Sequence, residues 1–211
     1  MLTTPIEQVS FVAIDVETTG LDPIRDKIVE IGAVRVTGGR MVEEFETLVG
    51  IKRSMPPYAE RVHRITNEML LGKPPIEEAL GMLTAFLGDC MPVEHCHESF
   101  DMAFLAYAHG KPLAPVIINT YALSRSLFPF LPSHSLQTCC KMHRITNRTP
   151  HRALSDARAT AQLLICLTGI CAKRYPRLGD LMKVAAAGAA TPIEGRNRAR
   201  ARQAGRRQGR L

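Results

Sequence analysis

The feature that most constrains this chain is a short apolar strand that ends in two acidic residues. Residues 9–16 are rich in Val and Ile, and Thr-Thr-Gly follows at 18–20, a pattern that predicts a buried strand and then a turn. Residues i and i+2 of a strand point to one face, so we expect Asp15 and Glu17 side by side at its carboxyl end. Desolvated like charges repel each other. A bound cation would remove this repulsion; alternatively, Glu17 is solvated and Asp15 only caps the turn.

The remaining pattern predicts a mixed sheet flanked by helices. Two further strands are expected at 27–37 and 41–49, joined by a Gly-Gly turn. Short strands are then expected at 90–96 and 116–118, a short helix or turn at 58–64, and helices at 76–87, 100–109, 121–127, 135–143 and 152–167. Ser99 is the expected N-cap of the helix at 100–109. A three-stranded meander followed by alternating helices and strands predicts an α/β fold with a mixed five-stranded sheet.

Composition points to a globular protein without a membrane segment. Hydrophobic residues make up 45% of the 211, and no apolar run is long enough to span a bilayer. The N-terminus lacks the basic and apolar pattern of a signal peptide, so we expect a cytoplasmic protein with reduced cysteines. A zinc site is conceivable, but the spacing of its candidate ligands matches no common zinc motif. Those candidates are Cys90, His95, Cys96 and His97.

Most of the net charge of +7 lies at the C-terminus. Residues 191–211 contain seven arginines and one acid, so this segment carries +6 and the rest of the chain only +1. Such a composition predicts a disordered Arg-rich tail after a weak helix at 178–190. We therefore divide the chain into a folded domain, 1–175, and a C-terminal extension, 176–211. The tail is either a solubilising segment or an electrostatic contact to nucleic acid.

Two later segments supply further groups of the same chemistry. Asp101 lies in the first turn of one predicted helix, and Asp156 lies in another predicted helix, just after His151. Alone, Asp101 would only suit a helix N-terminus, Asp156 would be an ordinary surface residue and His151 an ordinary loop histidine. Together with the two strand acids, Asp101 and Asp156 could hold two divalent cations about 3.5–4 Å apart, as two-metal phosphodiester cleavage requires. A histidine that titrates near neutrality suits the general base.

Three segments resemble the motifs of the DEDDh 3′–5′ exonucleases. They are DVETTGL at 15–21, SFD at 99–101 and HRALSDA at 151–157. The family includes the proofreading epsilon subunit of bacterial DNA polymerase III, RNase T and oligoribonuclease. The similarity extends from about Ser10 to Leu167 in the family's order, and VHRITNE at 62–68 resembles the His-x-Ile-Thr segment of the epsilon type. One such motif is a weak signal, whereas three in order are a strong one.

The resemblance implies a fold, an activity and a catalytic set. The expected fold is ribonuclease H-like, and the expected activity is metal-dependent hydrolysis at the 3′ ends of single-stranded nucleic acid, with DNA favoured, to nucleoside 5′-monophosphates. The cofactors would be two Mg²⁺ or Mn²⁺ ions, and a DNA polymerase is a possible partner. Asp15 would bridge both ions. Glu17 and Asp156 would complete one site. Asp101 would support the other ion, and His151 would be the general base.

The resemblance also suggests substrate contacts and leaves two alternatives open. Thr18 and Leu21 would hold the 3′-terminal nucleotide. Cys96 and His97 stand where the family commonly has His-Asn, and Asn119-Thr120 replaces its Asp-Thr, so His97 could take over a contact to that nucleotide. The motifs do not separate DNA from RNA, because that choice depends on contacts to the 2′ position. The alternatives are an RNase acting on RNA ends or short oligonucleotides, and an inactive nucleic-acid-binding module that accompanies a polymerase.

Overall fold

The computed structural model describes residues 2–190, and the predicted Arg-rich tail at 191–211 lies outside the described residues. A five-stranded mixed sheet forms its centre, in the order β3-β2-β1-β4-β5. The strands are β1 (Phe11–Thr18), β2 (Ile28–Thr37), β3 (Arg40–Leu48), β4 (Met91–Glu94) and β5 (Ile118–Asn119). The first three pair antiparallel, whereas β4 and β5 run parallel to β1. This confirms the predicted α/β class and the mixed five-stranded sheet.

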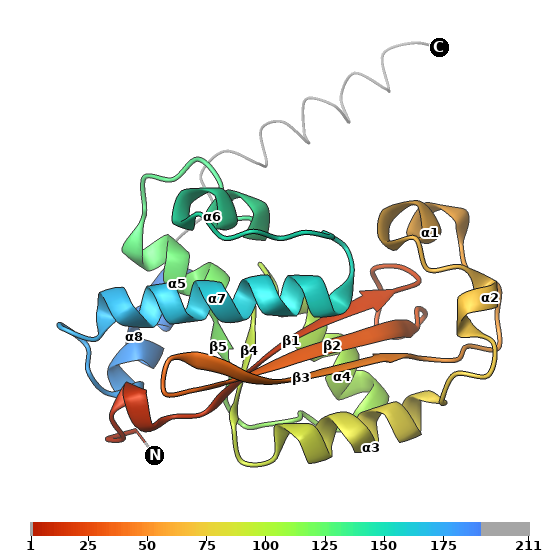
Figure 1. The fold of residues 1–211 in the computed structure, drawn as a ribbon, viewed down its shortest axis with the longest axis horizontal. Helices are drawn as coiled ribbons and strands as arrows, with labels where there is room; N and C mark the ends of the chain where they lie inside the picture. Colours follow the sequence, from red (N-terminus) through yellow and green to blue (C-terminus); the bar gives the residue numbers. More distant parts are fainter. Residues whose placement is uncertain (1, 191–211) are drawn as a thin grey trace, which may run out of the picture.

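Helices cover both faces of this sheet (Figure 1). They are the short 3₁₀ helix η1 (Ile6–Gln8), α1 (Pro57–His63), α2 (Asn67–Leu70), α3 (Ile76–Leu87), α4 (Phe100–His109), α5 (Thr120–Leu127), α6 (Leu136–His143), α7 (Ala153–Cys171) and α8 (Leu178–Ala190). The sequence pattern missed the four-residue α2 and ended α7 four residues too early, at 167. Helix ends are the least certain part of a pattern-based prediction. No helix within residues 2–190 combines the length and the apolar character needed to cross a lipid bilayer.

Strand alternation divides the core into two layers. Phe11 and Ala13 of β1 face the layer that contains α7, whereas Val12 and Ile14 face α3 and α4. Every second side chain of a strand points to the same face. Asp15 therefore continues the α7 face at the carboxyl end of the strand.

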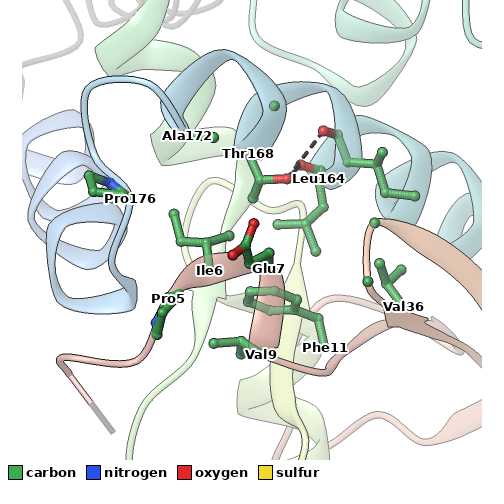
Figure 2. Close-up of a pocket in the computed structure, with 14 residues that line it drawn as sticks. Pro5, Ile6, Glu7, Val9, Phe11, Val36, Leu164, Thr168, Ala172 and Pro176 are labelled. Carbon is green, nitrogen blue, oxygen red and sulfur yellow. Dashed lines mark hydrogen bonds between the residues drawn. The ribbon is translucent and has the colours of Figure 1, made fainter.

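The N-terminal segment meets the start of the C-terminal extension near the amino end of β1. Figure 2 shows a pocket there, of about 340 Å³, between the segment that contains Ile6 and the last turns of α7. The Ile6 N–H donates to the Pro176 carbonyl at 2.9 Å, which ties this segment to the start of the C-terminal extension. Phe11 also lines the pocket, so the pocket lies at the opposite end of β1 from Asp15.

Helix α8 packs against the core of the domain. Leu178 and Leu181 are buried among the residues of the α7 layer. Gly188 brings α8 so close to α5 that a Cβ atom at this position would lie 1.9 Å from the Ala122 carbonyl oxygen. The described part of the extension thus packs against the domain, and the division after residue 175 stays a prediction.

A glycine on β2 allows the N-terminus of α7 to reach the sheet. A Cβ atom at Gly32 would lie 2.2 Å from the Leu154 nitrogen and 2.3 Å from the Ala153 carbonyl carbon. In the strand register, Gly32 pairs with Asp15. The close approach therefore places the first turn of α7 beside the acidic end of β1.

We predict that Gly32→Ala destabilises the protein, because the added methyl group meets backbone that cannot rotate away. Overpacking of this kind costs about 1–3 kcal/mol. The matched control is Gly81→Ala within α3, where a Cβ atom meets nothing within 4 Å; there we expect a gain of about 0.5–1 kcal/mol from helix propensity. Urea unfolding of the two variants measures both effects. Equal stability of the Gly32 variant and the wild type would contradict the packing argument.

Candidate active site

Three carboxylates meet at the carboxyl end of β1. Oxygen atoms of Asp15, Glu17 and Asp156 all lie within 4.8 Å of one another. The first two come from alternate positions of β1, and the third from the first turn of α7. Residues 141 positions apart in the chain are thus brought together by the packing of α7 on Gly32.

The fourth predicted acid comes from the helix that follows β4. β1 pairs with β4 over Phe11–Ala13, and β4 ends at Glu94, so Val16 lies beyond the paired residues. Asp101 is in the first turn of α4 and is 6% exposed. Its Oδ1 accepts a hydrogen bond from the Val16 N–H at 3.2 Å, so the carboxylate is held against the backbone between Asp15 and Glu17.

Ser99 occupies the predicted N-cap position of α4, but its side chain does not cap the helix. Ser99 has a φ angle of +51° and makes no side-chain cap bond. Its side chain instead acts on the Glu94 carboxylate, whose pKa burial raises and Ser99 lowers in part. The first N–H groups of α4 donate to the Cys96 sulfur, from Phe100 at 3.4 Å, and to Glu94, from Met102 at 3.4 Å. Because both acceptors come from the end of β4 and the loop after it, this connection sets the place of Asp101.

A short loop before α7 fixes Asp156. The His151 N–H donates to Asp156 Oδ2 at 2.8 Å, and the Asn147 amide donates to its Oδ1. Ser155 links the loop to the helix, because its hydroxyl donates to Asn147 at 2.7 Å and accepts from the Thr149 N–H at 3.2 Å. The loop and the first turn of α7 therefore form one hydrogen-bonded unit.

His151 is exposed at the edge of this unit. Its φ angle is +64°, a left-handed conformation that is uncommon for residues other than glycine. The Asp156 carboxylate accepts the hydrogen bond from its backbone. Burial raises the pKa of that carboxylate, and the nearby imidazole offsets part of the rise. The imidazole is thus beside the acidic cluster and accessible to solvent, as a general base for a bound water requires.

The acidic cluster has strongly perturbed pKa values. Burial and the neighbouring carboxylates raise the pKa of Glu17 to about 8 and that of Asp101 to about 7. The same causes raise the pKa of Asp15 well above its usual range, with Asp101 the largest neighbouring contributor. Such shifts are the cost of gathering acids in a desolvated site, and they are concentrated at functional sites.

Two acids that the motifs did not indicate lie next to this cluster. Glu30 on β2 is fully buried and pairs with Arg152, which directly follows His151. Glu94 on β4 is also fully buried and raises the pKa of Asp101. A single acid within an otherwise apolar strand was the available signal, because a buried charge needs a partner. No comparable signal identified Asn147, which lies in a polar loop.

The predicted substrate residues lie in different environments. Thr18 is buried, and its hydroxyl donates to the Gly20 carbonyl at 2.6 Å, which shapes the turn after β1. Leu21, on that turn, is 85% exposed. His97 packs edge-on against Tyr121, with ring centroids 5.3 Å apart. Within residues 2–190 no contact joins His97 to the four carboxylates, and its contact with a nucleotide stays a prediction.

A model of an exonuclease family, RNase_T, matches residues 12–164 of this chain. The chain belongs to this exonuclease family. The match spans all three motifs, which confirms the resemblance and the ribonuclease H-like fold that it implied.

This exonuclease is similar to two kinds of bacterial DNA polymerase III protein. It is 33% identical to the epsilon subunit of Treponema pallidum over 174 residues, which cover 80% of each chain. It is 39% identical to the PolC-type polymerase of Halalkalibacterium halodurans over 165 residues, which are 76% of this chain and 11% of that protein. The exonuclease thus spans about a tenth of the PolC-type relative.

Solved structures agree with these matches. Exonuclease X in complex with 5′ overhanging duplex DNA has a TM-score of 0.66 and 32% identity, over 81% of this chain and 98% of that one. The nuclease domain of 3′hExo, a DEDDh family member, has a TM-score of 0.65 over 79% of this chain and 95% of that one. Because the two sequences are only 14% identical, this similarity shows a shared fold and nothing more.

The carboxylate oxygens of this site are suitable ligands for a hard divalent cation. Asp101 and Asp156 accept hydrogen bonds from backbone and amide donors, whereas no group among residues 2–190 donates to the carboxylates of Asp15 or Glu17. Their oxygens are therefore available, and closely spaced carboxylate oxygens are the ligands that Mg²⁺ and Mn²⁺ prefer.

We predict that the metal-free exonuclease loses stability as the pH rises from 6.5 to 8. A carboxyl whose pKa is raised on folding binds more protons in the folded state, so stability falls between its unfolded and folded pKa, here 4.5 and about 8 for Glu17. His95, whose pKa burial lowers from 6.5 to about 4, has the opposite effect, which is complete above pH 6.5.

Thermal unfolding in a chelator at several pH values measures this loss. The fall in melting temperature should be smaller in Glu17→Gln, which cannot ionise, and millimolar Mg²⁺ should raise the melting temperature of the wild type at pH 8. Parallel pH profiles for the wild type and Glu17→Gln would show that this carboxyl does not titrate in the window.

Proposed function

We propose that the protein is a metal-dependent 3′–5′ exonuclease that releases nucleoside 5′-monophosphates from single-stranded DNA ends. The observation that carries the proposal is the convergence of Asp15, Glu17 and Asp156 within 4.8 Å. Asp101 and His151 complete the set at the same end of β1. This is the full set of acids and base that hydrolysis of a phosphodiester needs.

The carboxylates would hold two divalent cations, Mg²⁺ or Mn²⁺. Glu17 and Asp156 would bind one ion, Asp101 would support the other, and Asp15 would contact both. When bound, the ions supply positive charge at the scissile phosphate and acidify the attacking water.

The protein's own residues would manage the proton and the strand end. The exposed His151 imidazole would accept the proton of the attacking water. Attack at phosphorus breaks its bond to the 3′ oxygen of the preceding nucleotide, which leaves a shortened strand with a 3′ hydroxyl group. Leu21, which is 85% exposed on the turn after β1, would contact the terminal base, and the Thr18 backbone would hold its sugar.

DNA is the favoured substrate because of the similar proteins. Exonuclease X was solved in complex with 5′ overhanging duplex DNA, and the epsilon and PolC-type relatives are DNA polymerase III proteins. The same relatives support a DNA polymerase as the partner of this exonuclease.

We predict that Asp15→Asn abolishes release of mononucleotides, since this residue would contact both ions. His151→Gln should lower kcat by about 10²–10⁴-fold, the usual contribution of a positioned general base. Labelled single-stranded DNA and RNA of one sequence, incubated with Mg²⁺ or Mn²⁺, provide the assay. Matched controls are Asp89→Asn, an exposed acid before β4, and His109→Gln at the end of α4; both should keep wild-type rates.

Three results of this assay would contradict the proposal in different ways. Activity that survives both site substitutions would refute the assigned mechanism. Faster cleavage of RNA than of DNA would make the protein an RNase. Wild-type protein that binds single strands but releases no mononucleotide with either metal would be an inactive binding module.

We also propose that the Arg-rich segment at 191–211 contacts the nucleic-acid backbone. Its charge of +6 would add phosphate contacts, each of which steepens the fall of affinity with salt. Removal of residues 191–211 should weaken binding of single strands and flatten the plot of log K against log salt concentration, while kcat at saturating substrate is unchanged. An unchanged slope would mean that the segment makes no phosphate contacts.

A further inference from the structure

We propose that Glu30 keeps the Arg152 guanidinium away from Glu17, so that Glu17 remains free to bind a cation. Glu30 is thereby a positioning residue, because it acts through Arg152 and touches no reacting atom. This inference rests on the proposed metal-dependent function and assigns a role to a residue outside the three motifs.

Glu30 is held as a charge partner inside the core. Its side chain is 0% exposed, and both of its oxygens accept from the Arg152 Nε, at 3.0 and 3.1 Å. The Arg152 Nη2 donates to one of them as well, and the Ala153 N–H donates to the other at 2.8 Å. Glu30 therefore caps the N-terminus of α7 and binds the arginine at the same time.

Glu17 is the neighbouring carboxylate within reach of the same arginine. In the register of β1 and β2, Glu17 lies directly opposite Glu30, and side chains of such pairs lie on one face with Cβ atoms about 4.5–5.5 Å apart. The charge of Arg152 already acts on Glu17, whose pKa it lowers against the larger effect of burial. The Arg152 Nη2 also lies 3.8 Å from Glu46 Oε1, so several carboxylates lie near the guanidinium.

Whether Arg152 pairs with Glu30 or with Glu17 determines whether the Glu17 carboxylate can bind a cation. An arginine paired with a carboxylate through two hydrogen bonds is a strong, charge-assisted contact, and such a contact would occupy the oxygens that a metal ion needs. Arg152 pairs with Glu30 because the Glu30 carboxylate is fully buried and also accepts a hydrogen bond from the helix backbone. A buried carboxylate that lost its arginine would carry a large desolvation cost.

The substitution that tests this role is Glu30→Gln. Glutamine has the same shape, and its amide oxygen can still accept from the Ala153 N–H, so the helix cap is retained. The variant lacks the negative charge, so Arg152 would move to Glu17 and compete with the cation. We expect the dissociation constant of Mn²⁺ to rise by about 10–100-fold, as for other residues that support metal ligands.

Two companion variants separate this competition from a merely structural role. Arg152→Gln removes the competitor and should keep the wild-type affinity for Mn²⁺ or improve it. The double variant Glu30→Gln/Arg152→Gln should recover most of the affinity that Glu30→Gln loses. If the ion pair only stabilised α7, all three variants would lose affinity.

The matched control is a second arginine–glutamate pair on the same helix. Arg158 donates to Glu44 of β3 from Nε at 2.7 Å and from Nη2 at 2.6 Å, but this pair is exposed to solvent. Glu44→Gln should leave Mn²⁺ binding unchanged.

Mn²⁺ binding is measured on the full-length proteins by electron paramagnetic resonance of the free ion, with thermal unfolding as a check on folding. Equal affinities of Glu30→Gln and the wild type would overturn the inference, as would a double variant no better than Glu30→Gln. Should Glu30→Gln not fold, a tenfold loss in Arg152→Gln alone would still contradict it. Wild-type protein that binds no Mn²⁺ would instead overturn the proposed function itself.

Discussion

Four carboxylates that repel one another converge at the carboxyl end of β1, where the packing of α4 and α7 brings them together. Burial and this repulsion together raise the pKa of Glu17 to about 8 and that of Asp101 to about 7. The fold answers with fixed donors for two of the acids: the Val16 N–H for Asp101 and the His151 N–H for Asp156. The strand acids have no such donors among residues 2–190. A protein that keeps this arrangement gives up stability for a function that needs negative charge at one point.

Docking of α7 on the sheet turns this local feature of β1 into a complete site. Gly32 lets the helix approach to a distance that no side chain would allow, and Glu30 accepts from its first N–H. The consequence is that Asp156 and the loop with His151 arrive beside the strand acids in a single hydrogen-bonded unit. The two β2 residues lie opposite Asp15 and Glu17 in the register, so one pair of strands determines both the acids and the seat of the helix that completes them.

Most of the fold and the five proposed catalytic residues could be predicted from the sequence, because their signals are local. The alternation in β1 predicted that Asp15 and Glu17 share a face, and the order of the motifs predicted the family. The supporting contacts could not be predicted in this way. Ser99 stands at the N-cap position of α4, as predicted, but its backbone is left-handed and its side chain makes no cap bond. The pair formed by Glu30 and Arg152 joins residues 122 positions apart, and only tertiary packing reveals such a partner.

We propose that these carboxylates bind divalent cations, and anomalous X-ray scattering from crystals grown with Mn²⁺ would locate such ions. We expect an anomalous peak within coordination distance of Asp15, Glu17 and Asp156, and a second peak between Asp15 and Asp101 when a nucleoside 5′-monophosphate is also present. Crystals in which Mn²⁺ at saturating concentration gives no peak at this cluster would show that these carboxylates do not bind the ion.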